Sequence, residues 1–236
     1  LGPWTFFNPD TILAMSVDDI RTRFTRLGIR YAVYCGGWVD RKHDAKRIGF
    51  GTGVMDDYWA NFRSRLKGAA ERIREAVPDC RVLVYYDTQR DTSEGGHERF
   101  TDSWLTSRNG DQLSTEWSGQ YSLTQSVVAT LGNTFGKAML EVVDRYLDDL
   151  HADGLYWDEM ENVAYGVPLI TYNQQDGHTC ILDPETYTIQ HDVGLTTLLG
   201  ERHRLAVIER TRKQGGSLWA TARRQPRTCC KPVFNG

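Results

Sequence analysis

The sequence lacks any run of about 20 apolar residues, the length that a membrane-spanning helix requires, so we expect no membrane partner. It also lacks a basic excess, because 28 Lys and Arg stand against 31 Asp and Glu, for a formal net charge of −3. A protein that binds nucleic acid normally carries a basic patch or stripe, so we expect no nucleic-acid partner. The two absences favour a ligand of another kind.

Several cofactor and nucleophile motifs are absent as well. The sequence contains no G-x-G-x-x-G or GK[ST] turn, no H-E-x-x-H pair and no G-x-S-x-G elbow. Its five Cys are an odd number without the paired spacing of a zinc site. We therefore expect neither a metal ion nor an organic cofactor.

The sequence does contain a repeated unit, in which a segment with helical periodicity is followed by a short apolar strand. Hydrophobic residues make up 40% and charged residues 25%, as in an ordinary globular protein. Nearly continuous apolar strands between helices are typical of a parallel sheet that helices cover. After a short apolar segment at 4–7, the predicted helices and strands are 16–27 with 30–35, 56–76 with 81–86, 133–150 with 155–157, and 195–213 with 217–220.

The predicted fold is α/β, of the (β/α)8 TIM-barrel type. The segments after residues 35, 87 and 158 are long, and long loops at the carboxyl ends of strands favour a barrel over an open, doubly wound sheet. A barrel needs eight strands in about 250 residues, whereas only five strands can be counted here. We therefore expect residues 1–220 to form part of a β/α-barrel catalytic domain, as a fragment of a larger barrel. Residues 221–236 have no periodicity and are expected to be an irregular tail, which a truncation or a shifted reading frame would produce.

Acidic residues gather where the predicted strand 155–157 ends. Asp158 leaves the sheet at its carboxyl end, and Glu159 and Glu161 follow at once. Three acids so close repel one another, so at least one should have a raised pKa unless a cation compensates. Such carboxyls serve as nucleophile and as general acid and base in the cleavage of glycosidic bonds. The alternative is that they cap the next loop and are solvated.

A further acid, Asp87, ends the strand 81–86 in the same way. Neighbouring parallel strands lie about 4.8 Å apart, close to the roughly 5–5.5 Å between the two carboxyls of a retaining glycosidase. If the strands that end at Asp87 and Asp158 are neighbours, their carboxyls are expected to form such a pair. Binding of a sugar hydroxyl by Asp87 is an equal alternative.

Aromatic, amide and guanidinium side chains near these strand ends are suited to hydroxyl-rich ligands. We therefore expect a carbohydrate partner. The expected substrate contacts are Trp38, Tyr86, Arg90, Trp157, Asn162 and Trp219.

The segment Asp153-Gly154-x-x-Trp157-Asp158-x-Met160-Glu161 resembles the fourth-strand region of the retaining barrel glycosidases of the α-glucosidase and α-galactosidase superfamily. In α-glucosidases of that superfamily, a Trp precedes the nucleophilic Asp in a similar acidic, Met-containing stretch. The resemblance therefore implies that Asp158 is the nucleophile. The order differs here, because Glu159 directly follows the Asp, and no acid/base segment is found downstream. The acid would be Glu159, Glu161 or Asp87, or would lie outside this chain.

Together, the residues and the resemblance predict a glycoside hydrolase that cleaves an oligo- or polysaccharide without a cofactor. Two alternatives stay open. A catalytically inactive barrel would bind carbohydrate through the same aromatic residues. A metal-dependent hydrolase would use Asp87, Asp158 and Glu161 as oxygen ligands.

Overall fold

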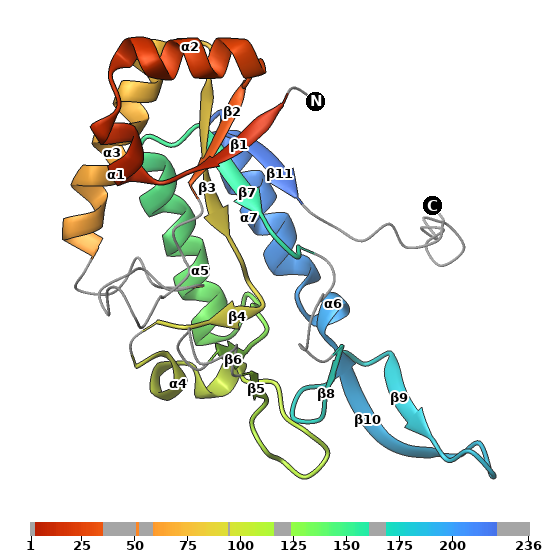
Figure 1. The fold of residues 1–236 in the computed structure, drawn as a ribbon. Coiled ribbons are helices and arrows are strands. Elements are labelled where there is room, and N and C mark those ends of the chain that lie inside the picture. Colours follow the sequence, from red (N-terminus) through yellow and green to blue (C-terminus); the bar gives the residue numbers. More distant parts are fainter. Residues whose placement is uncertain are drawn as a thin grey trace.

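The computed structural model describes residues 3–34, 51, 59–93, 95–115, 124–160 and 169–220, and its centre is a five-stranded parallel sheet (Figure 1). The strands have the same order in the sheet as in the chain, and each pairs in parallel with the next. The described strands do not close into a barrel. The parallel α/β arrangement predicted from the sequence is therefore confirmed, and the closed barrel is not. The five strands are β1 (Trp4–Phe7), β2 (Tyr31–Tyr34), β3 (Arg81–Tyr86), β7 (Gly154–Trp157) and β11 (Ser217–Ala220).

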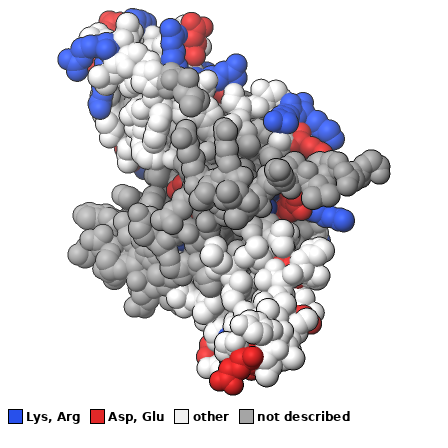
Figure 2. Space-filling view, turned by 90° about the vertical axis from the view of Figure 1, so that its right-hand side faces the viewer, with Lys and Arg blue, Asp and Glu red and all other residues white. Residues whose placement is uncertain are grey.

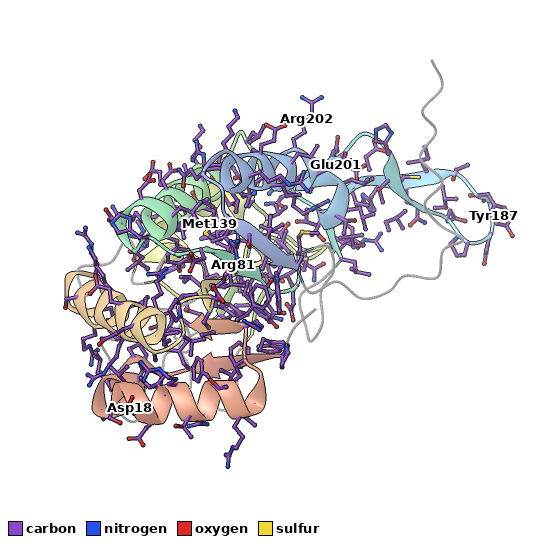
Figure 3. All side chains as sticks on the ribbon, turned by 90° about the horizontal axis from the view of Figure 1, so that it is seen from above. Asp18, Arg81, Met139, Tyr187, Glu201 and Arg202 are labelled. Carbon is purple, nitrogen blue, oxygen red and sulfur yellow. The ribbon has the colours of Figure 1, made fainter. Side chains whose placement is uncertain are left out.

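Helices connect each strand to the next and cover the outer side of the sheet. Seen from above in Figure 3, they follow one another around this outer side. Their buried faces and the outer face of the sheet form the main hydrophobic core. The helices are α1 (Pro9–Ala14), α2 (Val17–Leu27), α3 (Trp59–Ala76), α5 (Thr134–Asp144) with the π-helical η3 (Arg145–Asp149), α6 (Thr196–Leu199) and α7 (Glu201–Lys213).

Local capping interactions set the ends of the predicted helices. Ser16 Oγ accepts a hydrogen bond from the N–H of Asp19 at 3.1 Å, at the three-residue spacing of a capping box. Gly28 ends α2 in the left-handed conformation, with φ of 63°. The helix predicted over 195–213 is wrong as one continuous helix, because Gly200, a poor helix former, separates α6 from α7.

The sheet is strongly curved, and its concave face carries aromatic side chains. The rings of Tyr31 on β2 and Trp219 on β11 are 4.2 Å apart, although β3 and β7 lie between these two strands. In a flat sheet the three strand spacings would add to about 14 Å, and side chains perpendicular to the sheet would not meet. Trp4 on β1 likewise contacts Tyr156 on β7, at 5.5 Å. The five strands therefore form an arc with helices outside and aromatic side chains inside.

Two small antiparallel sheets lie beyond the carboxyl ends of β3 and β7, in segments predicted from the sequence only as long loops. The pair formed by β9 (Thr179–Leu182) and β10 (Ile189–Leu195) projects from the rest of the molecule and has Tyr187 near its tip (Figures 1 and 3). Acidic side chains gather at this tip in Figure 2. The first sheet consists of β4 (Arg90–Asp91), β6 (Thr124–Ser126) and β5 (Ser114–Thr115), with α4 (Gly96–Arg99) and the 3₁₀ helix η2 (Thr101–Ser103) nearby in the chain. The second consists of β8 (Ile170–Thr171), β10 and β9.

In the part of the chain that the structure describes, no helix combines the length and the apolar character needed to span a membrane.

Candidate active site at the carboxyl ends of β3 and β7

β3 and β7 are neighbours in the sheet, which was the condition for pairing Asp87 with Asp158. Tyr86, the last residue of β3, is opposite Trp157, the last residue of β7. The N–H of Asp158 continues the pairing by donating to the carbonyl oxygen of Tyr86 at 2.9 Å. The two Asp residues therefore leave neighbouring strands at the same edge of the sheet.

Two hydrogen bonds hold the carboxylate of Asp158. The hydroxyl of Tyr85 donates to Oδ2 at 3.1 Å, and the N–H of Glu159 donates to Oδ1 at 3.1 Å. Tyr85 belongs to the aromatic cluster of the concave face, and Asp158 is partly exposed at its edge. The two hydrogen bonds fix the orientation of this carboxylate.

Arg90, at the start of β4, lies between the two other acids of the site. Its Nη2 is 2.9 Å from Oε2 of Glu159, and its Nη1 is 3.8 Å from Oδ2 of Asp87. The side chain of Arg90 is only 5% exposed, so both ion pairs are shielded from water. Arg90 therefore binds the protein's own carboxylates, in contrast to the substrate contact predicted for it from the sequence.

Burial raises the pKa of both acids that face Arg90. The pKa of Asp87 rises to about 6, because its carboxyl is buried and because Asp158 is near, although Arg90 opposes the rise. The pKa of Glu159 rises to about 7 through burial and through the charges of Asp87 and Asp158, again opposed by Arg90. Raised pKa values were expected from repulsion between close acids, but burial is the larger cause.

Gln89 links Asp87 to Glu159, and sequence reasoning did not identify it. Its N–H donates to Oδ1 of Asp87 at 2.8 Å, and its Nε2 donates to the carbonyl oxygen of Glu159. The first contact forms a turn that Asp favours two residues before the donor, so the sequence carried a signal for it. The second contact joins residues from neighbouring strands and has no local signal.

The structure places Tyr86 and Trp157 in the core, which corrects their prediction as substrate-binding residues. Their side chains are 1% and 0% exposed, and their rings meet edge to face at 5.0 Å. The hydroxyl of Tyr86 donates to the carbonyl oxygen of Met139 on α5 at 3.1 Å (Met139 is labelled in Figure 3). Successive residues of a strand face opposite sides of the sheet. Because Asp158 faces the concave side, Trp157 faces the helices.

The remaining predicted site residues, which are the other substrate contacts and the catalytic candidate Glu161, either lie away from the carboxyls or fall outside the described residues. Trp219 lies on the concave face, opposite Tyr156 in the register and therefore two positions short of the level of Asp158. Trp38, Glu161 and Asn162 lie outside the described residues.

The described residues offer no group of three His, Cys, Asp or Glu side chains that could hold a metal ion. Instead, the ion pairs with Arg90 engage the carboxylates of Asp87 and Glu159. The site is therefore a cluster of three carboxyls and one guanidinium, which is suited to the transfer of protons and to nucleophilic attack.

No protein-family model and no curated protein matches the chain. Its fold is similar to those of solved carbohydrate-active enzymes. An α-N-acetylgalactosaminidase from Bifidobacterium bifidum matches 92% of the chain with a TM-score of 0.50 and 10% identity. An α-galactosidase from Thermus thermophilus, in complex with p-nitrophenyl α-D-galactopyranoside, matches 93% with a TM-score of 0.49 and 15% identity. A cycloisomaltooligosaccharide glucanotransferase from Paenibacillus sp. matches 68% with a TM-score of 0.46 and 8% identity.

The chain spans about a third or less of the length of these proteins, covering 34%, 38% and 24% of their chains, respectively. Identities of 15% or less indicate a shared fold and no more. The class that fold and comparison define together is a mixed α/β protein with a parallel sheet like that of glycosidases.

Proposed function

We propose that the chain carries the active site of a glycoside hydrolase, in which Asp158 is the nucleophile and Glu159 is the general acid and base. One observation carries this proposal: three carboxyls share the edge of β3 and β7, and their surroundings differ. Asp158 is partly exposed and is held by two hydrogen bonds, whereas burial raises the pKa of Glu159 to about 7. One oriented carboxyl at an accessible position and one carboxyl with a raised pKa are what a nucleophile and a general acid require in such enzymes.

The steps of the proposed reaction follow from this difference. An oxygen of Asp158 attacks the anomeric carbon, and the bond from that carbon to the leaving oxygen breaks while Glu159 gives that oxygen its proton. Glu159, now anionic, then takes a proton from a water molecule that attacks the glycosyl ester and releases Asp158. Asp87 is less suited to the acid role because its side chain has no exposed surface.

Substrates with different leaving groups test the role of Glu159. A 2,4-dinitrophenyl glycoside needs little protonation of its leaving oxygen, whereas an alkyl glycoside needs full protonation. We expect Glu159→Gln to slow hydrolysis of the alkyl glycoside by roughly 10²–10⁴-fold and of the activated glycoside much less. Asp87→Asn is the comparison for the other carboxyl whose pKa is raised, and Glu98→Gln, at an exposed position, is the control. An equal loss on both substrates for Glu159→Gln would contradict its role as the acid.

The ion pair between Arg90 and Glu159 favours a second candidate, a sugar-binding protein without catalysis. A guanidinium at 2.9 Å stabilises the anionic form of Glu159, which cannot donate a proton. A panel of aryl α- and β-glycosides, including the α-galactoside and the α-N-acetylgalactosaminide, separates the two candidates. The hydrolase releases phenol, and the binding protein only binds the sugars.

The protonation of these acids predicts that stability falls as pH rises from about 4 to about 7. Asp87 and Glu159 have pKa values of about 6 and about 7 in the folded protein, against 3.8 and 4.5 ordinarily. Between these values the folded state binds more protons than the unfolded state, so the free energy of unfolding decreases with increasing pH. Thermal unfolding midpoints between pH 4 and pH 8 measure this decrease. Glu159→Gln should flatten it and Glu98→Gln should not, and an unchanged slope in Glu159→Gln would refute the prediction.

We also propose that residues 1–220 belong to a larger β/α-barrel catalytic domain. The sheet is curved, and Trp4 and Phe6 on the concave face are 42% and 47% exposed. The coding sequence on either side of the chain tests this proposal. Further helix-and-strand units would support it, and a natural start and stop at the present ends would refute it.

A further inference from the structure

We propose that Gln89 is a positioning residue for Glu159, and that one water molecule in a small cavity between Gln89 and His203 bridges its amide oxygen to the His203 ring. The catalytic consequence rests on the proposed function, whereas the positioning itself does not. Three features carry the inference: the contacts of Gln89, the backbone of Glu159 and the polar atoms of the cavity.

Gln89 contacts both Asp87 and Glu159, the two acids whose pKa values are raised. Its backbone makes the first contact and its side chain makes the second. The N–H of Gln89 donates to Oδ1 of Asp87 at 2.8 Å, so its backbone is fixed to the end of β3. Its side-chain Nε2 donates to the carbonyl oxygen of Glu159, so the side chain reaches to the end of β7. Gln89 therefore spans the two strand ends that form the site.

Glu159 needs such support, because its backbone is in an uncommon conformation. Its φ is 50°, in the left-handed region that residues other than glycine rarely adopt. In this conformation Oε2 of Glu159 is 2.9 Å from Nη2 of Arg90. Conformations of this kind persist only where surrounding contacts hold them, and the hydrogen bond from Gln89 is such a contact.

Behind Gln89 lies a cavity of about 20 Å³, which is large enough for one water molecule. Two buried polar atoms in its lining residues have no hydrogen-bond partner in the structure: Oε1 of Gln89 and Nδ1 of His203.

The chemistry of these two atoms selects the ligand. His203 is fully buried on α7, and burial lowers its pKa to about 4, so the ring is neutral at ordinary pH. Its Nε2 lies 2.9 Å from the carbonyl oxygen of Gly136, which accepts, so Nε2 carries the hydrogen and Nδ1 is an acceptor. Oε1 of Gln89 is an acceptor as well. A water molecule, with two hydrogens to donate, satisfies both acceptors at once.

The carbonyl oxygen of Glu159 can only accept, so Nε2 of Gln89 faces it and donates to it. In this orientation Oε1 faces away from Glu159 and accepts from the water. The flipped amide would bring two oxygen atoms together at Glu159. His203, in α7, thereby supports Glu159 at the edge of the sheet through the water and Gln89.

The test uses Gln89→Leu, which keeps the backbone contact with Asp87 and removes the amide. We expect Glu159 to leave its left-handed conformation, so that its carboxyl is no longer buried beside Arg90. The measured pKa of Glu159, from a carbon-13 NMR titration of its carboxyl assigned with Glu159→Gln, should fall by one unit or more toward its ordinary value. His203→Leu should lower it in the same direction by less. Gln190→Leu, at an exposed Gln of the projecting hairpin that also makes one side-chain hydrogen bond, should leave it unchanged.

Two further measurements complete the test. A nuclear Overhauser effect between the Gln89 side-chain amide and a long-lived water, in the unaltered protein, is expected and does not depend on the folding of any variant. If the chain hydrolyses glycosides, Gln89→Leu should lower kcat by about 100-fold with little change in KM. A Glu159 pKa that is unchanged in folded Gln89→Leu, or the absence of the bound water, would overturn the inference. A shifted pKa in a chain that cleaves no glycoside would support it and refute the proposed function alone.

Discussion

Replacing Asp158 with Asn is expected to lower the hydrolysis of aryl glycosides by at least about 10⁴-fold while leaving the fold intact. The amide of Asn cannot attack an anomeric carbon, yet it has nearly the same size. Its oxygen can accept the hydrogen bond from the N–H of Glu159, and its Nδ2 can donate to the hydroxyl of Tyr85. Sugar binding should therefore persist. Initial rates on aryl glycosides and calorimetric titration with the corresponding free sugars measure the two properties separately.

Asp79→Asn is the matched control for this substitution. Asp79 is also an Asp beside β3, but it lies before the strand, is 88% exposed and is 3.9 Å from Arg30. Its loss should change the rate by less than about twofold, because an exposed ion pair contributes little. Turnover retained by Asp158→Asn would refute its assignment as the nucleophile.

Replacing Trp157 with Ala is expected to lower the free energy of unfolding by about 3–5 kcal/mol. The ring is fully buried between the sheet and the helices and packs edge to face on Tyr86. Its removal leaves a cavity that surrounding side chains can fill only in part, and the thermal midpoint should fall by roughly 10 °C or more. Chemical denaturation at a pH where both variants are folded gives the difference directly.

Trp4→Ala and Trp157→Phe are the controls that separate packing from sugar binding. Trp4 is 42% exposed, so its loss should cost less than about 2 kcal/mol. Trp157→Phe keeps an aromatic ring in the core and should leave the KM for glycosides unchanged. A large rise in KM in that variant, with unaltered stability, would instead indicate that Trp157 contacts the substrate.

The strands and the main core could be predicted because they depend on local patterns. The apolar residues that give 133–150 its helical periodicity are all buried in the structure: Phe135, Met139, Val142, Tyr146 and Leu150. The small antiparallel sheets were not predicted, and in the first of them the strands are short and polar. β5 has two residues and β6 three, and neither alternates apolar with polar residues.

The candidate site was predicted in part, and the errors have one physical origin. The ends of parallel strands meet at one edge, so the acids at 87 and 158 could be brought together from the sequence. The strand before Asp87 is apolar throughout because both of its faces are buried, so the sequence did not show which side Tyr86 faces. The role of Arg90 was missed for a similar reason, since its partner Glu159 comes from a different strand.

The two outer strands of the described sheet have a consequence for the chemistry. β1 pairs only with β2, and β11 only with β7, among the strands that the structure describes, so each presents a row of backbone donors and acceptors on its other side. A strand that joined β11 in parallel would end at the same rim as β7. An acid following that strand would face Asp158 across the curve of the arc, as Trp219 meets Tyr31. In the proposed hydrolase, the full set of carboxyls around one sugar is therefore a property of the completed rim, to which the ends of β3 and β7 contribute Asp87, Asp158 and Glu159.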